Sequence, residues 1–239
     1  MIVAVIHLEF LLAQPLKTAL LRNNFLADIK SAKKLVDEIQ QFSVSTPAVP
    51  CNLHIKQVHR VVGLAFMGLI AEWEEFLEQT FIRYLSNGQS KNGFKAPHKI
   101  GQSKNMKHSY ELLSGDPNYD PEKKFLRFSD PTWTLSKADF FFTNGDPYSI
   151  IRNHLQNLKN ATKIRNRVAH GSKKCKADFK QVALAMTNPS GTTLTQGYRP
   201  GELLLELATR HFGTEFHATT YFEAYCEIMK RMAENICPE

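Results

Sequence analysis

A long helical repeat between Ile55 and Leu85 constrains this chain more than any other feature of its sequence. The segment IKQVHRVVGLAFMGLIAEWEEFLEQTFIRYL places apolar residues at three- and four-residue steps, the period of an amphipathic α-helix. Between Val61 and Ile70 the apolar residues cover nearly every side. A helix that is apolar all round must be surrounded by other elements, so this segment is predicted to be the buried central helix of a bundle.

Three further segments have the same period and supply the expected neighbours of this helix. One precedes it and ends at Pro47 and Pro50, which cannot continue a helix. A second covers residues 147–170, where Gly171 supplies a C-terminal stop, and a third begins near Thr214. The three apolar stripes consist of Leu20, Leu21, Phe25, Ile29, Ala32, Leu35 and Ile39; of Ile150, Ile151, Leu155, Leu158, Ala161, Ile164 and Val168; and of Phe216, Tyr221, Tyr225, Ile228 and Met232.

The stretch between the central helix and residue 147 has little apolar period. Residues 86–108 mix Gly, Ser, Asn and Lys and predict a long basic loop, the most mobile part of the chain. Three Asp-Pro turn signals follow before helix returns at 135–142. Residues 86–133 thus form an insertion that is long for a compact domain, and long insertions are often functional.

Two short segments complete the pattern. Residues 176–186, KADFKQVALAM, predict a short helix. Residues 190–207 suit a small β-hairpin, although their second run could equally be helical. We therefore expect an all-α bundle with one small β-hairpin at most, in which a helical segment within residues 1–50 packs on a domain of residues 51–239.

Composition favours a soluble protein with anionic partners. The chain has 239 residues, of which 43% are hydrophobic, and a formal charge of +7, which favours polyanions through counterion release. Its start lacks the basic region and cleavage site of a signal peptide, and no stretch reaches the roughly 20 apolar residues that span a bilayer. The cysteines show neither C-x-x-C nor zinc-ligand spacing, so we expect a cytoplasmic protein, not inserted in a membrane, with four reduced thiols: Cys51, Cys175, Cys226 and Cys237.

The segment KIRNRVAHGS, residues 163–172, carries the candidate chemistry. Asn166 and His170 are four residues apart and so are expected on one helical face, which Lys163 extends by a turn. Arg165 is five residues before His170, about 140° around an ideal helix, so these two side chains do not converge within one chain. A symmetric dimer would bring two copies of the helix end face to face.

The string RNRVAH resembles the Arg-Asn-x-x-x-His motif of HEPN domains. A second segment, LIAEWEEFLEQTF at residues 69–81, is similar to the Trp-Glu-x-Phe-Leu segment in the branch called RiboL-PSP-HEPN or MAE-28990-type HEPN. The resemblance covers roughly residues 55–236. It implies a HEPN-like helical bundle that homodimerises around a basic cleft and, in active members, a metal-independent endoribonuclease without a cofactor.

Carried over by position, the resemblance makes Arg165 and His170 the catalytic pair and Asn166 a supporting polar residue. The family has an additional acidic contributor that is less regular, and Glu74 or Glu75 is the candidate for it here. The candidates for binding RNA are the basic residues around the motif, Lys163, Arg167, Lys173 and Lys174. The resemblance also suggests a toxin or antiviral defence effector, with an antitoxin or a neighbouring defence protein as partner.

These residue types suit RNA cleavage. The 2′-OH must be deprotonated, the charge on the phosphorane stabilised and the 5′-oxygen protonated. Histidine, with an ordinary pKa of about 6.5, serves as base or acid, and arginine presents a planar fork to phosphate oxygens. With one histidine from each subunit, the acid and base roles could be divided, and the product would be a 2′,3′-cyclic phosphate formed in the presence of EDTA.

Other interpretations stay open at the motif and in the whole chain. His170 could be only a cation that caps a helix C-terminus, and Asn166 a structural hydrogen-bonding residue. The chain could be a non-catalytic HEPN module that binds nucleotide or RNA or mediates assembly. A helical transcriptional regulator would suit the charge, but no helix-turn-helix with a basic recognition helix is present.

Two other groups of residues have alternative readings. His211, Glu215 and His217 suggest a metal site, but the spacing fixes no further close ligand, so no metal is expected. The insertion either steers single-stranded RNA or is simply solvated. The residues that could steer RNA are Lys91, Lys95, Lys99, Lys104 and Lys107, with Phe94 and Tyr110 for stacking.

Overall fold

The computed structural model describes residues 17–42, 53–208, 211–216 and 218–239. In these residues all regular structure is helical apart from three isolated β-bridges, so the fold is all-α, as predicted. The α-helices, in chain order, are α2 (Ala19–Gln41), α3 (Ile55–Leu85), α4 (Met106–Ser114), α5 (Pro131–Phe141), α6 (Leu155–Ala169), α7 (Lys173–Thr187), α8 (Pro200–Leu205) and α9 (Tyr221–Ile236). The 3-10 helices are η1 (Thr143–Gly145), η2 (Tyr148–His154) and η3 (Thr214–Phe216).

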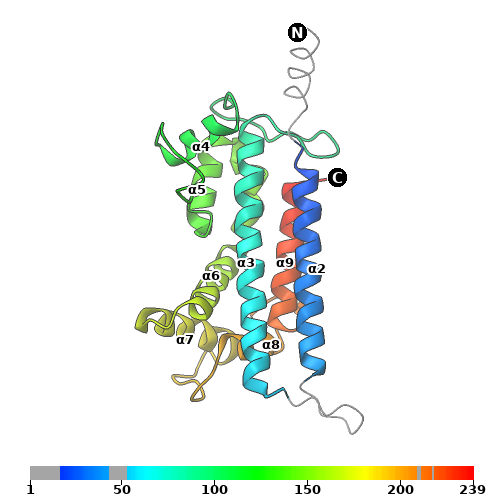
Figure 1. The fold of residues 1–239 in the computed structure, drawn as a ribbon, viewed down its shortest axis with the longest axis vertical. Helices are drawn as coiled ribbons and strands as arrows, with labels where there is room; N and C mark the ends of the chain where they lie inside the picture. The colour runs from blue at the N-terminus through cyan, green and yellow to red at the C-terminus, as the bar shows by residue number, and fades with distance from the viewer. Residues whose placement is uncertain (1–16, 43–52, 209–210, 217) are drawn as a thin grey trace.

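Helix α3 occupies the predicted segment residue for residue and forms the centre of the molecule. Figure 1 shows α2 and α9 running along it, α4 and α5 near one end, α6 beside its middle, and α7 and α8 near the other end. Phe66 of α3 packs against Phe222 and Tyr225 of α9, with ring centroids 6.2 and 5.2 Å apart. The hydroxyl of Tyr84 donates to the carbonyl of Ile236 at 2.8 Å. The prediction of a central helix is therefore confirmed, but its apolar middle section is not covered on every side, since Leu64 is 46% exposed.

The apolar stripe predicted for α2 is only partly right. Phe25 and Ile29 are buried, but Leu20 is 67% exposed and Leu35 is 44% exposed. Their places on the buried face are taken by Val36 and by Arg22, which is 7% exposed. Arg22 tolerates burial because its guanidinium forms an ion pair with Glu239 and donates to the carbonyl of Cys237 at 3.2 Å. Pro47 and Pro50, which were expected to end this helix, lie outside the described residues.

The structure places two helix boundaries, the start of α9 and the end of α6, at other residues than predicted. Helix α9 does not begin near Thr214 but after Thr220, whose hydroxyl accepts from the backbone N–H of Glu223 at 3.2 Å. The carboxylate of Glu223 accepts from the N–H of Thr220 at 2.8 Å, which completes a capping box. Helix α6 ends at Ala169 because the next residue is extended, so it does not stop through a left-handed Gly171.

Residues 190–207 form no hairpin. The second run is helix α8, and the first is irregular chain without a strand. A short apolar run has no period that separates helix from strand, which is why both readings were open. The short helix predicted at 176–186 is confirmed, and it extends from Lys173 to Thr187.

The insertion at residues 86–133 is folded onto the bundle, and α4 lies within it. The hydroxyl of Ser86 is hydrogen-bonded to those of Ser103 and Ser109 at 3.0 and 2.8 Å, which ties the start of α4 to the end of α3. Ser90 and Ala96 are also buried. The basic loop is therefore anchored at several points along its length.

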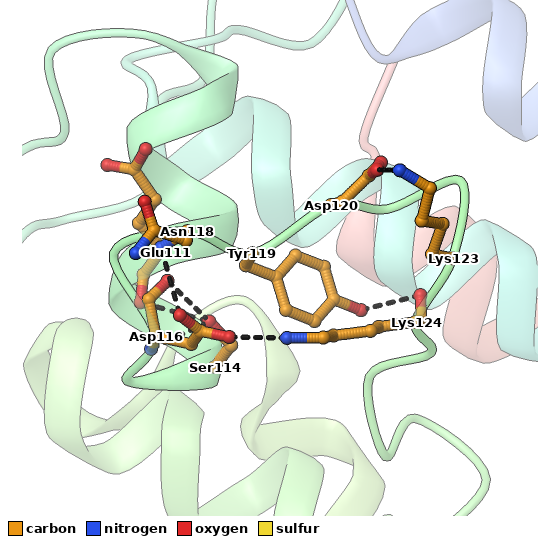
Figure 2. Close-up of polar contacts among 8 residues, drawn as sticks. All are labelled: Glu111, Ser114, Asp116, Asn118, Tyr119, Asp120, Lys123 and Lys124. Atoms are coloured by element: carbon orange, nitrogen blue, oxygen red, sulfur yellow. Dashed lines mark hydrogen bonds and ion pairs between the residues drawn. The ribbon is translucent and has the colours of Figure 1, made fainter.

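The Asp-Pro signals in the insertion form turns, as predicted. Figure 2 shows Lys124 reaching the carboxylate of Asp116 at 2.6 Å, while Tyr119 donates to the carbonyl of Lys124 at 2.8 Å. In the same tract Lys123 contacts Asp120 at 2.9 Å. The third signal, Asp130, accepts from the backbone of Thr132 at 2.9 Å and caps α5, with Pro131 in the first turn.

None of the described helices is both long and apolar enough to cross a lipid bilayer. Cys175, Cys226 and Cys237 are free thiols, and Cys51 lies outside the described residues.

The contact between α8 and α3 predicts a large penalty for a small substitution. A Cβ on Gly201 would lie 1.8 Å from the carbonyl oxygen of His59, which is backbone and cannot swing away. We expect Gly201→Ala to lower the free energy of unfolding by about 3 kcal/mol. In the control Gly68→Ala, an added Cβ on α3 meets nothing within 4 Å. Because alanine favours a helix more than glycine, we expect this variant to have a free energy of unfolding about 0.5–1 kcal/mol higher than the wild type. Urea denaturation of both variants tests this, and equal midpoints would contradict it.

Candidate functional site

Arg165 is held in place by residues of two helices. Its Nη2 lies 3.4 Å from Oε2 of Glu74, on α3, and its Nη1 donates to Oδ1 of Asn166 at 3.1 Å. The side chains of Arg165 and Glu74 are 27% and 20% exposed, so the pair lies at the edge of the bundle. The guanidinium is therefore oriented by a fixed acidic partner while part of it still faces solvent.

Glu74 is the acid that contacts the motif. Burial raises the pKa of Glu74, and the nearby Arg165 lowers it in part. Oε1 of Glu74 is buried and has no hydrogen-bond partner in the part of the chain that the structure describes. Glu75 points elsewhere: it lines a hollow between α2 and α3 together with Asp28 and Glu72. Of the two acidic candidates, only Glu74 meets Arg165.

His170 follows the last residue of α6 and is exposed. Its φ of −132° and ψ of 136° are extended, so the helical backbone ends before this residue. Its backbone N–H donates to the carbonyl of Asn166 at 2.9 Å, and its own carbonyl accepts from Nη1 of Arg167 at 3.3 Å. Among the described residues its ring has no hydrogen-bond or ion-pair partner, and none links it to Arg165. His170 thus ends the helix through its backbone and leaves its imidazole free for a ligand.

The predicted RNA-binding residues lie around this helix end. Lys173 and Lys174 are exposed in the first turn of α7, which starts where Ser172 accepts from the N–H of Cys175 at 3.2 Å. Lys163 is half-buried and forms no ion pair with a described residue. The motif and its neighbouring lysines thus form one basic end of the α6–α7 hairpin.

Arg167 lines a hollow of about 530 Å³ between the N-terminal part of α3, the end of α6 and the start of α8. Two arginines that the sequence did not single out, Arg60 and Arg199, line the same hollow. No spacing in the sequence connects them with the motif, since only the packing of α8 on α3 brings them to it.

Other candidate groups are engaged in the fold. The ring of His211 lies 3.2 Å from the amide of Asn160, Glu215 pairs with Arg231 at 3.0 Å, and His217 is not among the described residues. Across residues 17–42, 53–208, 211–216 and 218–239, no three His, Cys, Asp or Glu side chains gather as a metal-ligand set.

The aromatic side chains proposed for base stacking face protein partners. The rings of Phe94 and Tyr84 are 5.9 Å apart, and Tyr110 stacks on Tyr119 at 5.8 Å. The lysines of the basic loop are exposed at positions 91, 95, 99, 104 and 107. The loop therefore offers charge to a ligand but not these two rings.

No family model, no curated protein and no solved structure matches the chain. The resemblance to HEPN domains accordingly depends on the two short segments at residues 69–81 and 163–172.

The buried position of Glu74 predicts a defined pH dependence of stability. Because its pKa is raised in the folded protein, ionised Glu74 costs free energy, and that cost grows as pH rises from about 4.5 through the folded-state pKa. We expect Glu74→Gln to become more stable relative to wild type as pH rises over this window, measured by urea denaturation from pH 4.5 to 8. In an Arg165→Met background, where no guanidinium favours the ionised carboxylate, Glu74→Gln should raise the free energy of unfolding by a larger amount. A relative stability that falls with rising pH would show that Arg165 outweighs burial.

Proposed function

We propose that this protein is a metal-independent endoribonuclease of HEPN type that acts as a homodimer. The observation that carries the proposal is the contact of Arg165 with Glu74 and Asn166. A guanidinium has five N–H donors in a rigid fork, and these two contacts use only part of them. The remaining donors can meet the oxygens of a phosphate without a large loss of side-chain entropy, because the fork is already oriented.

In the proposed reaction His170 moves protons and Arg165 stabilises charge. A base takes the proton of the 2′-OH, the 2′-oxygen attacks the adjacent phosphorus, and the bond to the 5′-oxygen breaks as that oxygen receives a proton. The products are a 2′,3′-cyclic phosphate and a 5′-hydroxyl. Arg165 offsets the negative charge that develops on the phosphorane.

A second protomer supplies what one chain lacks. Within the chain, Arg165 turns toward α3 while His170 leaves the helix in an extended conformation. A two-fold axis near the end of α6 would place the His170 of each protomer opposite the other motif, which completes the site and allows the acid and base roles to be divided. On the resemblance alone we also propose a cytoplasmic toxin or antiviral defence effector, with an antitoxin or neighbouring defence protein as partner.

A non-catalytic HEPN module is the second candidate. It is favoured by the fact that Arg165 already has two protein partners and touches no part of the His170 ring. Such a module would bind nucleotide or RNA, or assemble with a neighbouring protein, without cutting RNA.

Cleavage of labelled RNA in EDTA separates these candidates. We expect the wild-type protein to cut RNA and His170→Ala to be at least about 100-fold slower, because general acid–base catalysis contributes about 10² to 10⁴. His108→Ala changes a histidine that only accepts from the backbone of Lys104 in the described structure, and it should cut like wild type. End-group analysis should give the cyclic phosphate. A 3′-hydroxyl product, strict dependence on Mg²⁺, or equal rates for the wild type and His170→Ala would contradict the mechanism.

The dimer makes a separate prediction. Sedimentation should give twice the 27.2 kDa of one chain, and specific activity should fall on dilution to concentrations at which the dimer dissociates. Activity that stays constant per chain in a preparation shown to be monomeric would contradict a site shared between protomers.

A further inference from the structure

Two adjoining hollows lie beside the motif and share one wall. The first, of about 530 Å³, lies between α3, α6 and α8, and the second, of about 370 Å³, lies between α7 and residues 193–198. Arg167, Gly197 and Tyr198 line both of them. We call the pair the arginine groove, and its basic residues are Arg60, Arg167, Arg199, Lys176 and Lys180.

The basic residues of the arginine groove have no carboxylate partner among the described residues. Arg167 donates to the carbonyl of His170 at 3.3 Å, and Arg199 donates to that of Lys56 at 3.5 Å, so the side-chain contacts of both are to backbone oxygens. Two acids contact residues that line the groove: Glu202 lies 3.8 Å from the ring of His59, and Glu206 accepts from the hydroxyl of Tyr198.

Four of the six other described arginines contact a carboxylate, namely Arg22, Arg152, Arg165 and Arg231, whereas Arg83 and Arg127 do not. The arginine groove differs from these two in gathering several unpaired cations on one concave surface. Such a cluster repels itself and stabilises no fold, so its presence favours an anionic ligand from outside the chain.

The walls of the groove are fixed before any ligand arrives. An added Cβ on Gly63 would lie 3.3 Å from Val168, and one on Gly201 would overlap the backbone of His59, so α6 and α8 are seated closely on α3. The ring of Tyr198 stacks on Phe179 at 6.2 Å, with 22° between the planes. A preformed groove of this kind binds without first ordering its own side chains.

We propose that the arginine groove binds the sugar-phosphate backbone of single-stranded RNA and leads the strand to His170. The cations are spread along two adjoining hollows and do not converge on one point, which fits successive phosphates better than a single one. Tyr198 lies in the wall that the two hollows share. The inference rests on the proposed function, because Arg167, which lines both hollows, also binds the carbonyl of the candidate catalytic residue.

Binding of uncleavable RNA tests the groove independently of catalysis. An RNA oligonucleotide methylated at every 2′-oxygen cannot react, so its affinity by fluorescence anisotropy reports binding alone. We expect Arg60→Glu/Arg199→Glu to bind at least about tenfold more weakly at 0.1 M salt. The slope of log affinity against log salt should fall by about 1.4, since each phosphate contact to a single strand contributes about 0.7.

A matched control separates the groove from overall charge. Lys30→Glu/Lys34→Glu makes the same change in net charge on α2, beside a different hollow that Ile29 and Cys226 also line, and should bind like the wild type. Because Arg199 also contacts the backbone of Lys56, a milder pair, Arg60→Gln/Lys176→Gln, changes side chains that bond to no described residue. That pair should keep the wild-type unfolding midpoint and still bind several-fold more weakly.

The outcomes distinguish this inference from the proposed function. Wild-type affinity in both groove variants, or an equal loss in the α2 control, would overturn the arginine groove. A nucleoside triphosphate that binds as tightly as the oligonucleotide, or tighter binding of double-stranded RNA, would overturn the single-stranded ligand. If the groove variants lose affinity as expected but neither the wild type nor His170→Ala cuts unmodified RNA, the groove stands and the nuclease proposal fails.

Discussion

The burial of α3 is the constraint on which the rest of the molecule depends. Because this helix is apolar on most sides, α2, α6, α8 and α9 have to pack around it. The same helix also supplies polar contacts to the candidate site. Glu74 orients Arg165 from its middle, and Gly63 and His59 set the positions of α6 and α8 from its first half. One buried element therefore fixes both the motif and the groove beside it.

The sequence was sufficient for the central helix, where the apolar period is longest. Helix α3 was predicted residue for residue because its apolar repeat is continuous and strong. The start of α9 was missed because Thr214 and Thr220 both suit a helix N-terminus, and only the reciprocal contacts of Thr220 with Glu223 decide between them. The hairpin suggested at residues 190–207 was wrong for a different reason. An apolar run as short as that of α8 has no period that distinguishes a helix from a strand.

For the candidate site, too, the sequence located some features and missed others. The local string at residues 163–172 located Arg165, Asn166 and His170 and the basic residues around them. Its geometry depends on contacts that no spacing encodes: Arg165 and Glu74 are 91 positions apart, and Arg199 reaches the backbone of Lys56 from 143 positions away. The extended conformation of His170 likewise depends on where α6 ends, and the sequence pattern carried this helix one residue too far.

The close seating of Val168 on Gly63 has a consequence for genetics. Val168 is two residues from His170, so enlarging Gly63 would push on the helix end that carries the imidazole, at the hollow that Gly63 and Val168 both line. If the chain is the toxic nuclease that we propose, a screen for variants that no longer arrest growth would recover such packing positions together with Arg165 and His170, and growth alone would not tell them apart. Protein abundance measured for each survivor would do so, because a packing defect lowers the amount of folded protein, whereas loss of the imidazole leaves it unchanged.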